Sequence, residues 1–133
     1  MNGPATVLLV DDDAGMRLTL SRILESHGYR VLAAPSGSAA LGLAATERFD
    51  LALLDFRMTG MDGAETCGRL SRLCPEAALY VVTAHVTQEA ADAALISGAA
   101  GILFKPVEVG CVLALIADEV GKRRAGACAG GGV

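Results

Sequence analysis

The sequence has no excess of basic residues, no long apolar run and few cysteines. Its 133 residues carry 11 Lys and Arg against 15 Asp and Glu, a formal net charge of -4. Nonspecific nucleic-acid binding needs a basic face that displaces counterions from phosphates, so this charge disfavours it. No apolar run approaches the ~18 residues of a membrane span. We therefore expect neither direct nucleic-acid binding by this chain nor insertion into a membrane.

The four cysteines do not have the spacing of a metal site. They form no CxxC pair, and the two histidines are distant from all of them. We therefore expect no zinc site of the usual kind. The N-terminus also lacks a charged and then apolar leader, so nothing signals secretion. We expect reduced thiols and a cytoplasmic protein.

The chain has the composition of one folded domain. Hydrophobic residues make up 53% of it and charged residues 20%, which excludes disorder. A length of 133 residues corresponds to about one domain. From residue 121 onward the sequence GKRRAGACAGGGV is typical of a fraying end. We expect a domain over residues 1–122 and a flexible C-terminal tail over residues 123–133.

Short apolar runs alternate with stretches of helical spacing. Continuous Val- and Leu-rich runs fit strands that are covered on both faces. These runs are Thr6–Val10, Arg30–Ala34, Leu51–Leu54, Leu79–Thr83 and Gly101–Phe104. Glycines and prolines separate the segments. The pattern predicts five β-α units, and hence an α/β, doubly wound parallel sheet with helices on both faces. Periodicity alone does not choose the strand order.

Polar residues follow four of the five predicted strands. The first run stops at Asp11, Asp12 and Asp13, and the third stops at Asp55. The fourth run ends at Thr83, and the fifth is followed by Lys105. Ligands bind beyond the carboxyl ends of the strands in a doubly wound sheet. The sequence therefore brings acids, a hydroxyl and a lysine to one edge.

This set of residues suits phosphoryl chemistry. Clustered carboxylates repel one another unless a cation or proton intervenes, and the oxygens of aspartates suit Mg²⁺. A lysine and a hydroxyl donate hydrogen bonds to phosphoryl oxygens, and an Asp carboxylate can itself form an acyl phosphate. The pattern predicts Mg²⁺-dependent phosphoryl transfer to an aspartate. Two other acids have a simpler interpretation, because Asp13 and Asp62 each precede a predicted helix and fit its N-cap.

The chain resembles the receiver domain of two-component response regulators over about residues 5–122. The matching segments are VLLVDDD (residues 7–13), LALLDFRMTGMDG (residues 51–63), VVTAH (residues 81–85) and GILFKP (residues 101–106). The resemblance implies a flavodoxin-like (βα)5 fold with strand order 2-1-3-4-5. It also implies a bacterial signalling switch, whose only catalysis is its own phosphorylation and slow autodephosphorylation.

The resemblance assigns roles to individual residues. Asp55 corresponds to the phospho-acceptor, and Asp11 and Asp12 to the acidic pair that holds Mg²⁺. The backbone carbonyl of Arg57 corresponds to a further metal ligand. Thr83 matches the hydroxyl that moves to the phosphoryl group, and Lys105 the base that pairs with it. The Lys105–Pro106 bond is expected to be cis.

One position departs from the family pattern. Ile102 stands where the family usually has an aromatic residue whose inward or outward rotamer reports activation. An aliphatic side chain cannot reproduce that aromatic flip. We expect Ile102 to act by packing alone.

The resemblance also implies partners. A sensor histidine kinase or phosphotransfer protein would donate the phosphoryl group, and an effector protein or a further output domain would read the switched surface. A phosphorylation-dependent dimer is a related expectation.

Two other functions remain open at this stage. One is an interaction module that is not phosphorylated. The other is a phosphatase of the haloacid dehalogenase type, which uses an Asp-x-Asp-x-Thr pattern. Asp11 and Asp13 fit that pattern, but Gly15 stands where it requires Thr.

Overall fold

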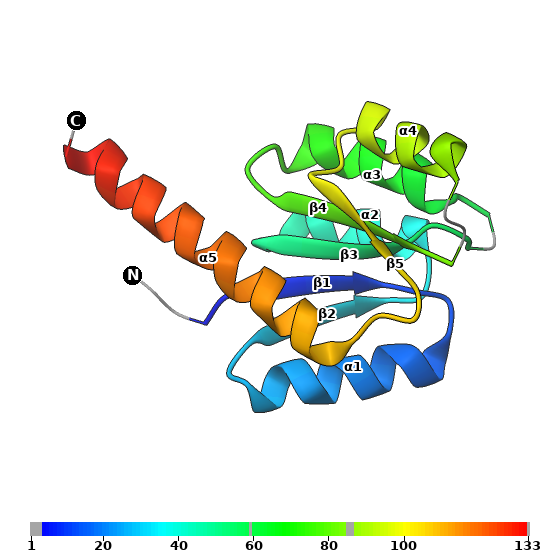
Figure 1. Cartoon of the computed structure of the whole chain (residues 1–133), viewed down its shortest axis with the longest axis horizontal. Helices are drawn as coiled ribbons and strands as arrows, with labels where there is room; N and C mark the ends of the chain where they lie inside the picture. Colours follow the sequence, from blue (N-terminus) through cyan, green and yellow to red (C-terminus); the bar gives the residue numbers. More distant parts are fainter. Residues whose placement is uncertain (1–3, 59, 85–86, 133) are drawn as a thin grey trace.

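Five parallel strands form one sheet in the computed structural model, which describes residues 4–58, 60–84 and 87–132, with the backbone alone for residues 90 and 123–132. The strand order is β2-β1-β3-β4-β5, so the doubly wound α/β fold and the order 2-1-3-4-5 are confirmed (Figure 1). The strands are β1 (Thr6–Val10), β2 (Arg30–Ala34), β3 (Leu51–Asp55), β4 (Ala78–Thr83) and β5 (Gly101–Phe104). The helices are α1 (Ala14–Ser26), α2 (Gly37–Thr46), α3 (Gly63–Leu73), α4 (Gln88–Ile96) and α5 (Val109–Gly132).

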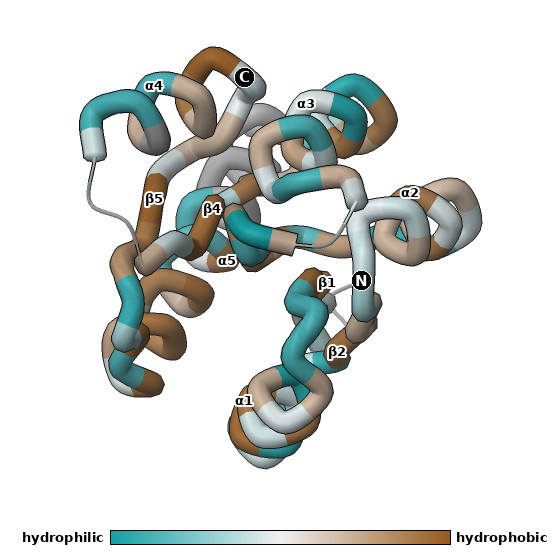
Figure 2. The backbone as a smooth tube through the Cα atoms, turned by 90° about the vertical axis from the view of Figure 1, so that its right-hand side faces the viewer, coloured by the Kyte–Doolittle hydropathy of each residue, from teal (hydrophilic) through white to brown (hydrophobic). Residues whose placement is uncertain are grey.

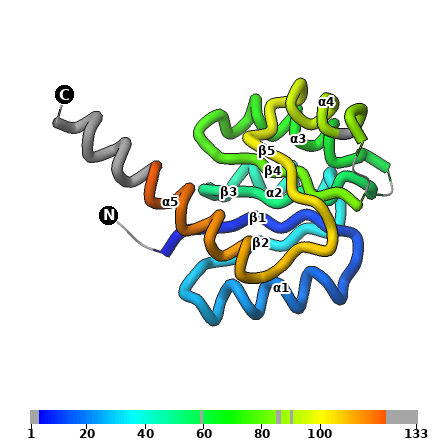
Figure 3. The backbone as a smooth tube through the Cα atoms, in the orientation of Figure 1, coloured from blue at the N-terminus to red at the C-terminus, as the bar shows by residue number. Residues whose placement is uncertain are grey.

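The two faces of the sheet carry separate hydrophobic cores. Alternate residues of a strand point to opposite faces. In β1, Leu8 and Val10 pack in the core that includes residues of α2, α3 and α4, whereas Val7 and Leu9 pack with residues of α1 and α5. Figures 1 and 3 show α1 and α5 on one side of the sheet. Figure 2 shows the hydrophobic character of β4 and β5 between the helices. Burial on both faces explains why the strands are continuous apolar runs.

Side-chain caps begin several helices where the sequence predicts them. One carboxylate oxygen of Asp13 accepts hydrogen bonds from the backbone N–H groups of Gly15 and Met16, at 2.9 and 3.2 Å. The Asp62 carboxylate accepts one from the backbone N–H of Glu65 at 2.8 Å. Both aspartates are thus N-caps, each a contribution of about 1 kcal/mol to stability.

The C-terminal helix is longer than the sequence predicts. Helix α5 runs to Gly132, and so includes residues 123–132 of the segment that we expected as a flexible tail. A glycine ends a helix most readily in a left-handed conformation. Among the described glycines, only Gly28, Gly60 and Gly98 have positive φ, so Gly121 does not act as such a stop. Within the described ranges, none of the helices combines the length and apolar character needed to cross a bilayer.

The start of α3 lies directly against the end of β3. A Cβ atom on Gly63 would lie 2.5 Å from the backbone oxygen of Asp55 and 2.7 Å from the Cα of Phe56. The backbone N–H of Gly63 also donates to the Phe56 carbonyl at 2.8 Å. Only glycine permits this approach without moving the backbone.

Gly63→Ala is expected to lower the free energy of unfolding by about 1–3 kcal/mol, because the added methyl group has no space. Gly42, in the interior of α2, is the matched control, because a Cβ there meets nothing within 4 Å. Gly42→Ala is expected to raise stability by about 0.5–1 kcal/mol, since alanine is the better helix former. Urea denaturation measures both. Equal effects of the two substitutions would contradict the close approach at Gly63.

Candidate functional site

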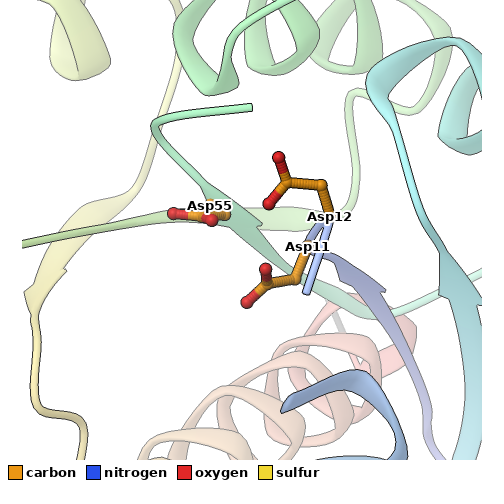
Figure 4. A group of neighbouring side chains, drawn as sticks. All are labelled: Asp11, Asp12 and Asp55. Carbon is orange, nitrogen blue, oxygen red and sulfur yellow. The ribbon is translucent and has the colours of Figure 1, made fainter. Parts of the chain in front are cut away.

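Three carboxylates meet at the carboxyl edge of the sheet. One oxygen from each of Asp11, Asp12 and Asp55 lies within 4.8 Å of the others (Figure 4). The register explains the meeting: Val10 in β1 pairs with Leu54 in β3, so the residues that follow, Asp11 and Asp55, lie side by side. This is also where the strand order reverses, since β2 lies on one side of β1 and β3 on the other. Such a switch point is the usual ligand site of doubly wound sheets.

Backbone and side-chain hydrogen bonds fix the segment that carries Asp11 and Asp12. The Asp11 carboxylate accepts the backbone N–H of Asp13 at 2.9 Å, and the Asp11 backbone N–H donates to the Ala34 carbonyl at 3.2 Å. The Asp11 carbonyl accepts from Nη1 of Arg17 at 2.6 Å. Asp12 is exposed, whereas Asp11 is half-buried. The segment is thus held in place while the carboxylate of Asp12 stays accessible.

Arg17 is a part of the site that the sequence analysis missed. The available signal was its spacing, because it lies four residues after Asp13, about one turn into the helix that Asp13 caps. Its guanidinium brings a positive charge to the edge that holds three negative ones.

Lys105 reaches the cluster from the far side of β4. Its Nζ lies 3.2 Å from Oδ1 of Asp55. Lys105 follows β5 and Asp55 ends β3, so this ion pair spans the end of the strand between them. The backbone N–H of Lys105 donates to the Thr83 carbonyl at 2.8 Å, and the Lys105–Pro106 bond is cis, as the resemblance predicts.

The surroundings of Asp55 disfavour its charge. The side chain of Asp55 is 9% exposed. Burial raises the pKa of the Asp55 carboxyl above its ordinary value, the hydrogen bond from Lys105 lowers it, and the neighbouring charge of Asp11 raises it. Burial and repulsion outweigh the lysine, so the pKa is raised. The site therefore gains from an added positive charge.

The donor set fits a small hard cation. Its atoms are carboxylate oxygens from three aspartates, the ligand type that Mg²⁺ prefers over softer nitrogen and sulfur ligands. A divalent ion would reduce the mutual repulsion of these oxygens. Its positive charge would also favour the ionised form of Asp55 and so lower the pKa of that carboxyl.

The remaining predicted residues lie around the cluster. Thr83 is buried at the end of β4. This strand lies between β3, which ends at Asp55, and β5, which Lys105 follows. Arg57 is exposed, two residues after Asp55. Ile102 in β5 is half-buried and packs against the core on the α2–α4 side. The structure thus brings Asp11, Asp12, Asp55 and Lys105 together.

Comparison with protein families gives one match over most of the chain. The family model of the response regulator receiver domain matches residues 7–117. A response regulator receiver protein of Anaeromyxobacter sp. (strain Fw109-5) is 44% identical over 108 residues, which are 81% of this chain and 45% of that protein. The transcriptional regulatory protein GlrR of Escherichia coli (strain K12) is 36% identical over 117 residues, 88% of this chain and 26% of that protein. The chain thus spans less than half the length of these curated relatives.

Solved structures agree with the sequence matches. A CheY-like response regulator receiver domain protein from Methanospirillum hungatei JF-1 superposes with a TM-score of 0.89 at 28% identity, covering 92% of this chain and 98% of that one. A response regulator from Burkholderia pseudomallei, solved with a phosphorylated aspartic acid, calcium ion and citrate, has a TM-score of 0.79 at 32% identity, covering 91% of this chain and 73% of that one. The chain belongs to the response regulator receiver domain family.

Proposed function

We propose that this domain accepts a phosphoryl group on Asp55 and thereby switches a protein-interaction surface. The observation that carries the proposal is the position of the Asp55 carboxylate. It is buried at a strand end, faces two further carboxylates and is paired with Lys105. The Burkholderia pseudomallei structure, which contains a phosphorylated aspartic acid, supports the same chemistry by similarity.

In the proposed reaction an Asp55 carboxylate oxygen attacks phosphorus, and the bond from phosphorus to the donor's leaving atom breaks. Asp11, Asp12, Asp55 and the backbone carbonyl of Arg57 would hold Mg²⁺, which supplies positive charge to the phosphoryl oxygens when bound. The Lys105 ammonium, already 3.2 Å from Asp55, would bind one of these oxygens. The Thr83 hydroxyl would bind another.

The proposed switch follows from where these two residues lie. Thr83 ends β4 shortly before α4, and Lys105 follows β5 shortly before α5. A shift of either toward a phosphoryl group would bias the surface formed by α4, β5 and α5 between two states. A sensor histidine kinase or phosphotransfer protein would donate the phosphoryl group in the cytoplasm. An effector, an output domain or a second copy would read the surface, and slow autodephosphorylation would reset it.

The phosphatase alternative is disfavoured by the position of Asp13. Here one Asp13 oxygen accepts two backbone N–H groups at the start of α1, and Asp13 is outside the carboxylate cluster. Asp13 thus has a structural role in the helix.

The protonation state of Asp55 makes the free energy of unfolding depend on pH. The pKa of Asp55 is raised in the folded protein, so the folded state binds its proton more tightly than the unfolded state does. Above this raised pKa, ionised Asp55 destabilises the fold in the absence of a cation. The free energy of unfolding therefore rises as the pH falls through the folded-state pKa, because the folded state binds the proton at a higher pH than the unfolded state does.

Incubation with acetyl phosphate and Mg²⁺ is expected to add the mass of one phosphoryl group to the protein. Asp55→Asn is expected to abolish the gain, because an amide oxygen is a poor nucleophile. Asp118→Asn, on the exposed face of α5, is the matched control and should retain it. Intact-protein mass spectrometry makes the measurement. A wild type that gains no mass from acetyl phosphate or from a phosphohistidine donor would favour the interaction module.

Asp55→Asn is expected to raise the free energy of unfolding by on the order of 1 kcal/mol in the presence of a chelator, at a pH above the folded-state pKa of Asp55, because it removes a buried charge. The difference from wild type should narrow as the pH is lowered through the folded-state pKa. Urea denaturation at a series of pH values measures it. Asp92→Asn, at an exposed position on α4, is expected to change stability by less than about 0.5 kcal/mol. A destabilised Asp55→Asn protein would contradict the electrostatic account.

A further inference from the structure

The peptide that joins Asp11 to Asp12 must leave the extended path of β1. Consecutive residues of a strand point to opposite faces of the sheet. Nevertheless, one carboxylate oxygen of Asp11 and one of Asp12 lie within 4.8 Å of each other and of an Asp55 oxygen, and Figure 4 shows both side chains directed toward Asp55. The orientation of this peptide therefore decides whether the two carboxylates can share one cation.

Arg17 holds this peptide from the beginning of α1. The carbonyl oxygen of Asp11 belongs to the Asp11–Asp12 peptide, and it accepts a hydrogen bond from Nη1 of Arg17 at 2.6 Å. A charged donor makes such a bond roughly twice as strong as a neutral donor does. The hydrogen bond from the Asp11 N–H to the Ala34 carbonyl fixes the preceding peptide. The two contacts together fix the backbone on both sides of the Asp11 side chain.

The helix gives Arg17 a rigid base. The backbone N–H of Arg17 donates to the Asp13 carbonyl at 3.0 Å, in the first turn of α1. Leu24, further along the helix, is fully buried and holds α1 against the sheet. Arg17 also lines a cavity of about 510 Å³ whose walls include residues of α1 and α5, so a different side chain at position 17 has room.

The charge of Arg17 and its hydrogen bond have opposite expected effects on a bound cation. A positive charge beside a cation site repels the cation, so the charge alone would weaken binding. A hydrogen bond that orients a ligand residue strengthens binding, and loss of such an outer contact typically costs about 10–100-fold in metal affinity. Among the described residues, Arg17 forms no ion pair with a carboxylate, and its guanidinium is directed to the Asp11 carbonyl. The geometry therefore favours the orienting effect.

We propose that Arg17 is a positioning residue for the cation site, and that its guanidinium holds the Asp11–Asp12 peptide so that both carboxylates face Asp55. The inference rests on the proposed Mg²⁺-dependent function. Arg17 contacts neither the cation nor the phosphoryl group. Its removal therefore weakens Mg²⁺ binding but leaves phosphoryl transfer unchanged once the cation is bound.

Isothermal titration calorimetry of Mg²⁺ into the full chain tests the proposal without any transfer step. Arg17→Met removes both the charge and the hydrogen bond, and it is expected to raise the dissociation constant for Mg²⁺ by about tenfold. An unchanged or lower dissociation constant would overturn the inference, because the loss of repulsion alone strengthens binding. A wild-type protein that binds no Mg²⁺ would overturn both this inference and the proposed metal-dependent reaction.

Further variants separate the hydrogen bond from the charge. Arg22→Met, at an exposed position on α1, removes a positive charge from the same helix and is expected to change the dissociation constant by less than about twofold. Arg17→Lys keeps the charge and a donor, and is expected to stay within about threefold of the wild type. A lysine variant as weak as Arg17→Met would overturn the assignment to the donated hydrogen bond. Arg17→Gln also removes the charge and shortens the side chain, so it gives the same comparison if Arg17→Met does not fold.

The rate of phosphorylation by acetyl phosphate distinguishes positioning from direct catalysis. In Arg17→Met the Mg²⁺ concentration that gives half the maximal rate is expected to rise by about tenfold, whereas the rate at saturating Mg²⁺ is unchanged. A lower rate at saturating Mg²⁺ would overturn the positioning role, because it would place Arg17 in contact with the reacting groups.

Backbone amide resonances provide a readout that needs no metal. In the presence of a chelator, Arg17→Met is expected to shift the Asp12 and Asp13 amide resonances. The Asp12 N–H belongs to the held peptide, and the Asp13 N–H donates to the Asp11 carboxylate at 2.9 Å. The Glu65 amide, which donates to the Asp62 cap of α3, is the control and should stay in place. Unchanged Asp12 and Asp13 resonances would overturn the proposal.

Discussion

The repulsion among three carboxylates at one edge of the sheet is the constraint on which the rest of the site depends. Asp11, Asp12 and Asp55 lie within 4.8 Å of one another, and Lys105 only partly offsets their charge. Such an arrangement persists only where the surrounding fold is stable enough to hold it. Two continuous cores support the strands, and hydrogen bonds fix the backbone of Asp11. A positive charge brought to this edge of the sheet would relieve the repulsion.

The sequence predicted the strands well because burial on both faces leaves a simple signal. Each strand is an apolar run bounded by polar or turn residues, and no observed boundary differs from its expected position by more than one residue. The strand order came from the family resemblance, because the same five runs are compatible with several orders. Nothing in the sequence indicates that α5 continues to Gly132, because its glycine-rich end is typical of a fraying tail, whereas Gly121 lacks the positive φ with which a glycine most readily ends a helix.

The residues of the candidate site that follow strands could be predicted from the sequence. The contacts that depend on how the helices pack could not. Asp55 and Lys105 follow apolar runs directly, so a parallel sheet brings them to one edge whatever the details of the helices. The contact of Arg17 with Asp11 depends on the orientation of α1. The cavity depends on the spacing between α1 and α5. Neither the angle of a helix nor a space between two helices leaves a pattern in the sequence.

Residues 11–13 each contact a different neighbour, so the number of residues in this segment is constrained. Asp11 lies beside β3, the Asp12 carboxylate joins the cluster, and Asp13 caps α1, so three consecutive residues serve three different neighbours. Adding one residue between β1 and α1 would move every one of these side chains to the wrong neighbour while keeping the composition. The number of residues between β1 and α1 is therefore set by three separate contacts at once.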